Sequence, residues 1–173
     1  MRDRRFIAEH RGGLLKTEQH RQFIRWGCVC AVHVLSLSGE KTDARLINAL
    51  LIGKEWEKGN ATVGEARKAS LVCIALAKEL TDPVSIAVAR AVGHAVATAH
   101  MADHALGAAL YALKAIQQSG ISIDDERKWQ NKQLPLEIRE VVLTTRGLKE
   151  KALKIDGSEP LIQQAKPKTG RNK

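Results

Sequence analysis

The chain has 173 residues, of which 44% are hydrophobic, so it is long enough for one domain with a sizeable core. Only 3% are aromatic, and a core of alanine, leucine, isoleucine and valine favours close-packed helices over a β-sandwich. No stretch approaches the roughly 20 uninterrupted apolar residues that cross a bilayer, and the start of the chain lacks the apolar segment of a signal peptide. We therefore predict an all-α, cytoplasmic protein without membrane contact.

The formal charge of +9 is concentrated at the two ends of the chain. Residues 1–25 and 147–173 each hold seven Lys or Arg and three acidic residues, whereas the residues between them are nearly neutral. We predict a basic N-terminal arm over 1–16, a helical domain over 17–147 and a basic, disordered tail over 148–173. Such ends favour weak, non-specific contact with nucleic acid. No aromatic platform or helix-turn-helix signature accompanies them, which argues against direct readout of bases.

Helix-capping residues mark the first half of the domain. Thr17 is expected to cap a first helix that stops near Gly39, and Thr42 to open a second helix that ends at Gly59. The T-x-x-E pattern starting at Thr62 is a capping box that opens a third helix.

The next segment is too long to form one helix. Asp82 and Pro83 open it, and nothing interrupts the helical pattern as far as Gln118. An unbroken helix over these residues would be about 54 Å long, whereas a globule of this size has a diameter of roughly 35 Å. We therefore predict a kink or break near His100 to Asp103, with Asp103 capping the second half.

Two further helices follow. Asp124 is expected to open one, Pro135 interrupts the pattern, and a last short helix should end at Gly147. The sequence thus predicts a compact single-domain array of six or seven helices around a long alanine-rich helix pair or one kinked helix. No internal repeat of fixed period is present.

Residues 93–115 of this central segment carry three histidines among alanines and glycines. On one straight helix, Gly93, His100 and Gly107 would fall on one line with His104 beside it, while His94 would point elsewhere. The favoured interpretation is close helix packing, in which the glycines give clearance and the imidazoles make fixed hydrogen bonds.

A metal site is the alternative interpretation of these histidines. His100 and His104 are four residues apart and could share a divalent ion such as zinc, with Asp103 or His94 as a third ligand. A zinc protease needs glutamate after the first histidine, where this chain has Met101. The favoured hypothesis therefore has no cofactor and no catalysis, and a metal-binding protein or metal-dependent enzyme remains the alternative.

Other catalytic patterns are absent from the sequence. It contains no G-x-S-x-G elbow, P-loop or G-x-G-x-x-G motif. Cys28, Cys30 and Cys73 lie in apolar helical runs and are expected to be buried, reduced thiols. Arg67 could pair with a carboxylate, and an aromatic patch near Trp56 or Trp129 would suit a binding surface.

Four stretches together carry a resemblance to a known family. They are RFIAEHRGG, VGEARKA, ARAVGHAVATAHMADHALGAALYALKA and ERKWQNKQLPLEIREVVL, within residues 5–146. The combination resembles the immunity-5-like family of bacterial toxin systems. The resemblance implies an all-α, cytoplasmic protein that binds and neutralises a cognate toxin, and it carries over no inhibitory residue.

The leading hypothesis is therefore a non-enzymatic, toxin-binding protein of immunity type. Inhibitors of nuclease toxins tend to be acidic, whereas this chain has a neutral body and basic ends. The toxin should then be something other than a strongly basic nuclease, or be bound away from its active site. The alternatives are the metal-binding protein and a nucleic-acid-associated accessory protein. A surface rich in small residues also permits a homodimer.

Overall fold

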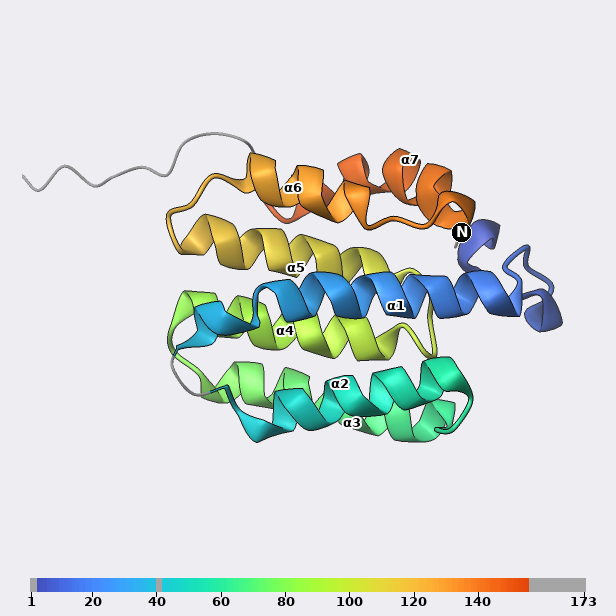
Figure 1. Ribbon diagram of the computed structural model, residues 1–173, viewed down its shortest axis with the longest axis horizontal. Helices are drawn as coiled ribbons and strands as arrows, with labels where there is room; N and C mark the ends of the chain where they lie inside the picture. The colour runs from blue at the N-terminus through green and yellow to red at the C-terminus, as the bar shows by residue number, and fades with distance from the viewer. Residues whose placement is uncertain (1–2, 40–41, 156–173) are drawn as a thin grey trace, which may run out of the picture.

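The computed structural model describes residues 3–39 and 42–155, and it confirms the predicted all-α fold (Figure 1). Seven α-helices lie in this part of the chain: α1 (Thr17–His33), α2 (Ala44–Lys58), α3 (Val63–Glu79), α4 (Pro83–Ala97), α5 (His104–Gln118), α6 (Ile123–Lys132) and α7 (Leu136–Ala152). Short 3-10 helices at Arg4–Phe6 and Glu9–Arg11 precede α1, and a third follows it at Leu35–Ser38. None of the described helices is long and apolar enough to cross a bilayer.

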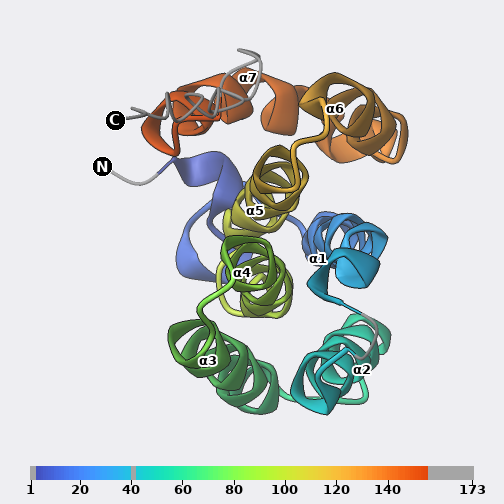
Figure 2. The same cartoon turned by 90° about the vertical axis from the view of Figure 1, so that its left-hand side faces the viewer.

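The helices form three layers when the molecule is viewed from its end (Figure 2). Helices α2 and α3 form one outer layer, α6 and α7 form the other, and α1, α4 and α5 lie between them. The alanine-rich α4 and α5 contact each other along their length, and α4 also packs against α3 and α1. Small side chains let these helices approach closely, so the core centres on α4 and α5.

Two predicted helix starts are confirmed in detail. Thr62 Oγ1 accepts a hydrogen bond from the Glu65 N–H at 3.1 Å, and Glu65 Oε2 accepts one from the Thr62 N–H at 2.7 Å. At the start of α4, Asp82 Oδ2 accepts a hydrogen bond from the Ser85 N–H at 2.8 Å, and Pro83 is the first helical residue. These caps depend on neighbouring residues alone, which is why the sequence revealed them.

Three other helix starts differ from prediction by one or two residues. Thr17 is the first residue of α1 and Lys16 is its N-cap, with the Lys16 N–H bonded to the Gln19 side chain at 3.1 Å. Asp43, not Thr42, caps α2. Likewise Ser122 caps α6, two residues before Asp124. In each case a neighbouring residue supplies the cap or occupies its position.

The predicted break in the central segment is confirmed. Helix α4 ends at Ala97, and α5 begins at His104 and runs back beside α4 (Figure 1). Asp103 immediately precedes α5, but its backbone is helical and its side chain makes no capping hydrogen bond. Asp103 thus occupies the predicted N-cap position but makes no side-chain capping hydrogen bond, and the break itself is where the length argument required it.

The last helix is longer than predicted. Helix α7 continues through Gly147 to Ala152, and an ion pair of 2.9 Å between Arg146 and Glu150 spans the glycine. A single glycine in a helix costs only about 1 kcal/mol, which such side-chain contacts offset. The helix end expected at Gly147 is thus wrong. Of the predicted basic tail, residues 156–173 lie outside the described residues.

Candidate functional site

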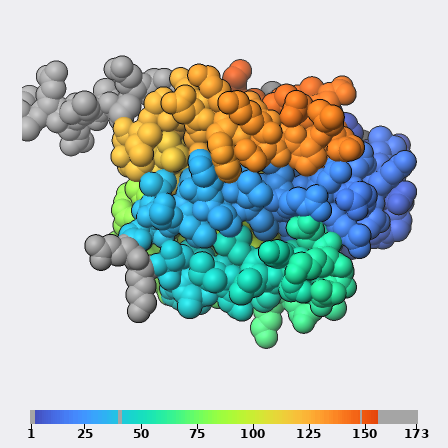
Figure 3. Space-filling model, in the orientation of Figure 1, coloured from blue at the N-terminus to red at the C-terminus, as the bar shows by residue number. Residues whose placement is uncertain are grey.

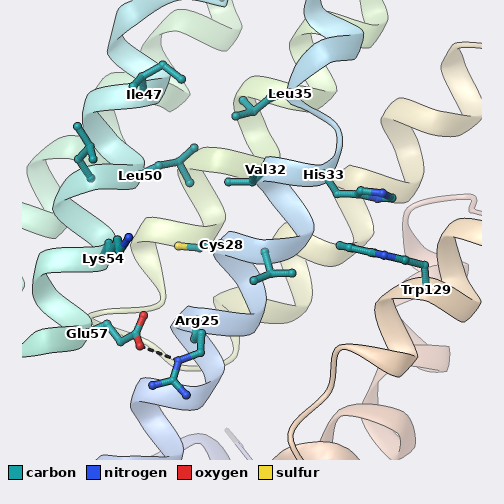
Figure 4. Close-up of a pocket in the computed structure, with 12 residues that line it drawn as sticks. Arg25, Cys28, Val32, His33, Leu35, Ile47, Leu50, Lys54, Glu57 and Trp129 are labelled. Carbon is teal, nitrogen blue, oxygen red and sulfur yellow. Dashed lines mark hydrogen bonds and ion pairs between the residues drawn. The ribbon is translucent and has the colours of Figure 1, made fainter.

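Helices α1 and α2 leave an apolar groove of about 610 Å³ between them. Both helices lie on the face of the molecule shown in Figure 3, and Figure 4 shows Val32 of α1 across from Leu50 of α2. The groove is lined by Arg25, Cys28, Val29, Val32, His33, Leu35, Ile47, Leu50, Leu51, Lys54, Glu57 and Trp129. Most of these side chains are apolar, so the groove presents a hydrophobic surface to solvent.

Three large apolar side chains in this groove are exposed. Val32 is 51% exposed, Ile47 42% and Leu51 56%, although the same helices bury other residues almost completely. Leaving a large aliphatic side chain in water forfeits about 1.5–3 kcal/mol of burial free energy. Their gathering along one groove marks it as a surface that a partner can cover.

Polar groups lie at one end of the groove. The Arg25 Nε–H donates to Glu57 Oε1 at 2.6 Å and links α1 to α2 there (Figure 4). Lys54 lies one helical turn before Glu57, is exposed, and makes no ion pair with a carboxylate of residues 3–39 or 42–155. The groove therefore offers one unpaired positive charge beside its apolar lining.

The Cys28 thiol in the groove is not a nucleophile at neutral pH. Burial, and to a smaller degree the nearby Glu57 carboxylate, raises the pKa of Cys28 to about 12. The reactive form of cysteine is the thiolate, which is scarcely populated about five units below that pKa. Cys28 therefore contributes to the groove as a small apolar side chain.

Trp129 of α6 forms the edge of the groove next to α1. Its ring stacks on the ring of His33 with centroids 3.6 Å apart and an interplanar angle of 11° (Figure 4). The His33 Nδ1–H donates to Glu126 Oε2 at 2.7 Å. The stack and the hydrogen bond together fix His33 and so hold Trp129 in place.

Behind this edge, buried polar groups connect α6 to α7. The Gln130 amide donates to Glu126 Oε1 at 2.9 Å, and Arg146 donates to Gln130 Oε1 at 2.6 Å. All three residues are at most 5% exposed, and hydrogen bonds to ionised groups are strong in such surroundings. The edge of the groove therefore has a rigid support that reaches α7.

Trp129, predicted from the sequence as a binding residue, lies at the edge of this groove. The exposed aliphatic residues of the groove were not predicted. The available signal was on the second helix, where Ile47 and Leu51 follow Leu46 and Leu50 by one position each and extend the apolar surface beyond one face.

His94 and His104 are brought together elsewhere, between α4 and α5. Their Nδ1 atoms are 3.1 Å apart, and the His94 ring stacks on Tyr111 with centroids 5.1 Å apart. Burial, followed by the charges of His104, Lys149 and Arg90, lowers the pKa of His94 to about 4. His94 is therefore neutral at pH 7. On one straight helix it would point away from His104, but the chain breaks between them, and the two residues meet because they lie on antiparallel helices.

Gly107 explains the close approach of these two helices. A Cβ atom at this position would lie 2.6 Å from His94 Nδ1. Gly93 instead faces α3, where an added Cβ would lie 2.9 Å from Ile74 Cδ1. Each glycine gives steric clearance as predicted, but they do so on different helices and against different partners.

The alternative metal site gains no support from this geometry. The His100 and His104 rings are 5.0 Å apart, and Asp103 Oδ2 lies 3.9 Å from Lys149 Nζ. Among the residues that the structure describes, no group of three or more His, Cys, Asp or Glu side chains could hold a metal ion.

Arg67, which was also predicted as a binding residue, lies on α3, exposed and outside the groove.

Comparison with known proteins places the groove within a recognised domain. A family model described as "Imm-5 like putative immunity protein" matches residues 13–137, which include every residue that lines the groove. No curated protein and no solved structure matches the chain.

Proposed function

Because the chain belongs to the Imm-5 like immunity protein family, we propose that it binds and neutralises a toxin through the groove between α1 and α2. In this proposal it acts in the cytoplasm of the cell that makes it, without catalysis. The observation that carries the assignment to the groove is the gathering of exposed Val32, Ile47 and Leu51 in one cavity. Such a patch on a small protein is typical of a protein interaction site.

The chemistry of the groove indicates what part of a toxin would fit. Two neighbouring helices with an apolar cleft between them provide a seat for a third helix, which would insert its apolar face. Lys54 lies unpaired at the edge and would face a carboxylate on that helix. We therefore expect the toxin to present an amphipathic helix with an acidic residue beside its apolar face.

Trp129 is the expected anchor of this interface. Tryptophan is enriched among the residues that dominate interface energies, particularly where its surroundings are rigid. The His33 stack and the hydrogen bonds behind it fix Trp129 before any partner arrives. Little conformational freedom is then lost on binding.

Co-expression with the products of the adjacent genes, among which the toxin is expected, tests the proposal. The wild-type chain should restore growth and co-purify with that toxin. Leu51→Asp places a charge in the groove and should abolish both effects, because an unpaired buried charge is costly. Leu71→Asp is the matched control, since Leu71 lies on α3 outside the groove with an exposed fraction of 57%, against 56% for Leu51.

Each outcome has a definite meaning. A wild-type chain that neither protects nor binds the neighbouring toxin would refute the toxin-binding function. Protection by Leu51→Asp equal to that of the wild type would instead show that the groove is not the contact surface. If sedimentation showed a wild-type dimer that Leu51→Asp dissociates, the groove would be an interface between two copies of the chain, and the proposed use of it would be wrong.

A further inference from the structure

The start of α4 and the ends of α5 and α7 lie at one end of the molecule (Figure 2). A second pocket is lined by residues of these three segments. Its volume is about 380 Å³, and its polar lining includes Arg90 from α4, Lys114 and Tyr111 from α5, and Lys154 after α7. Ile86 and Leu153 supply apolar walls. The pocket is separate from the groove, since the two share no lining residue.

The cations of this pocket lack carboxylate partners, although Lys114 Nζ donates to Gln117 Oε1 at 3.0 Å. No carboxylate lines the pocket, and Arg90, Lys114 and Lys154 make no ion pair within residues 3–39 and 42–155. Arg25, Arg45 and Arg146, by contrast, each contact a carboxylate oxygen within 3 Å. Three cations, one on α4, one on α5 and one just after α7, lie in one concave site and concentrate anions there.

Arg90 is held by a ring instead of a carboxylate. Its Cζ atom lies 5.6 Å from the centroid of the Tyr111 ring, and that ring in turn stacks on His94. The guanidinium makes no hydrogen bond to another residue in the described part of the chain. Its planar array of N–H donors is therefore available for two oxygens of a phosphate group.

The backbone brings Lys154 to the mouth of the pocket. Its φ of 53° is the left-handed conformation, and Lys154 is the only residue other than glycine with a positive φ among those described. The Ile155 N–H bonds to the Glu150 carbonyl at 3.1 Å, and the Ile155 side chain is buried, which together hold this turn closed. Glycine usually occupies such a position after a helix. A lysine there has a strained backbone that glycine would avoid, so stability of the fold does not account for it.

We infer that this pocket binds a small phosphomonoester. Arg90, Lys114 and Lys154 would contact the phosphate oxygens, and the organic part would lie against Ile86 and Leu153. The volume exceeds that of a bare phosphate ion and falls within the range of small-molecule sites. This inference does not depend on toxin binding.

Amide-detected NMR titration of the full chain at constant ionic strength tests the inference, with glycerol phosphate, inorganic phosphate and acetate as probes. Glycerol phosphate should shift the amide signals of Arg90 and Lys154 and bind more tightly than inorganic phosphate. Acetate, which has fewer oxygens and less charge, should bind about tenfold more weakly or not at all.

Variants connect the binding to the pocket. Arg90→Gln and Lys154→Gln should each weaken binding by about tenfold. Arg90→Lys keeps the charge but loses the planar donors, so its loss should be smaller. Lys128→Gln is the control, because Lys128 lies on α6 with a side chain 73% exposed. Circular dichroism confirms that each variant folds.

Several results would overturn the inference. No shift with glycerol phosphate at millimolar concentration would do so, as would equal binding of phosphate esters and acetate. Inorganic phosphate that binds as tightly as its ester would rule out a role for the apolar walls. Glycerol phosphate binding that is unchanged in Arg90→Gln and Lys154→Gln would show that the anion response comes from other basic residues.

Discussion

Helices α4 and α5 pack closely against each other, whereas helices α1 and α2 leave a groove between them. Helices α4 and α5 contact each other along their length, both are rich in fully buried alanines, and Gly107 of α5 lies against His94 of α4. Between α1 and α2 stand valine, isoleucine and leucine, and several of these are about half exposed. The distance between packed helices depends on the side chains at the contact, so small residues close one interface and large residues leave the other open.

The two regions are therefore expected to have different roles, the α4–α5 interface in stability and the α1–α2 groove in binding. The closed interface buries nearly all its apolar surface on folding and therefore supplies much of the stability. The open groove leaves apolar surface for a partner. A substitution should consequently change folding in the first region and binding in the second.

Truncating a leucine in each region should show the largest contrast. Leu106 of α5 is fully buried, so Leu106→Ala should lower the free energy of unfolding by about 4 kcal/mol through lost burial and a residual cavity. Leu51 is 56% exposed, and Leu51→Ala should lower it by less than about 1 kcal/mol. Urea-induced unfolding followed by circular dichroism measures both values.

Equal losses for the two variants would contradict the comparison. They would mean that the α1–α2 region is as tightly packed in solution as the α4–α5 interface. The toxin co-purification assay gives the complementary measurement, because Leu51→Ala should weaken binding whereas Leu106→Ala should affect it only through the stability of the fold.

The sequence predicted the closed region better than the open one. Helix starts such as Thr62 and Asp82 are local, and the break between α4 and α5 followed from a simple comparison of lengths. The alanine content of this segment also indicated close packing. These features depend on neighbours in the chain or on the size of the domain, both of which can be read without coordinates.

The groove could not be predicted because it depends on which helices become neighbours. His33, Leu51 and Trp129 come from three different helices, and nothing in their local sequence brings them together. The same holds for His94 and His104, whose contact requires the chain to reverse between them. Helix periodicity assigns residues to faces, but only the tertiary fold assigns a face to a partner.

The next prediction concerns the contact between His94 and His104 at the α4–α5 interface, which a change of pH tests. The pKa of His94 is lowered from 6.5 to about 4 in the folded chain, so the fold favours the neutral ring. This contribution is complete above about pH 6.5 and is lost as the pH falls towards 4, because the unfolded chain then binds a proton that the folded chain excludes. The shift corresponds to up to about 3 kcal/mol.

His94→Gln isolates this contribution from other titrating groups. Between about pH 7.5 and pH 4.5 the wild-type chain should lose up to about 3 kcal/mol more stability than the variant, as measured by urea unfolding at each pH. Parallel pH profiles for the two chains would show that His94 is not held neutral by the α4–α5 interface.

The smallest effect comes from adding one methyl group to a glycine in each kind of surroundings. Gly107→Ala would place a Cβ 2.6 Å from His94 Nδ1, and displacing that ring would break its contacts with His104 and Tyr111. We expect a net loss of about 1 kcal/mol even though alanine favours the helix by a similar amount. Gly147 lies in α7 with nothing within 4 Å of an added Cβ, so Gly147→Ala should gain about 0.5–1 kcal/mol. Thermal unfolding midpoints should therefore move in opposite directions. A higher unfolding midpoint for both variants would mean that α4 and α5 can separate slightly at little cost in free energy. The close packing of α4 against α5 would then depend on their alanine content and not on the clearance at Gly107.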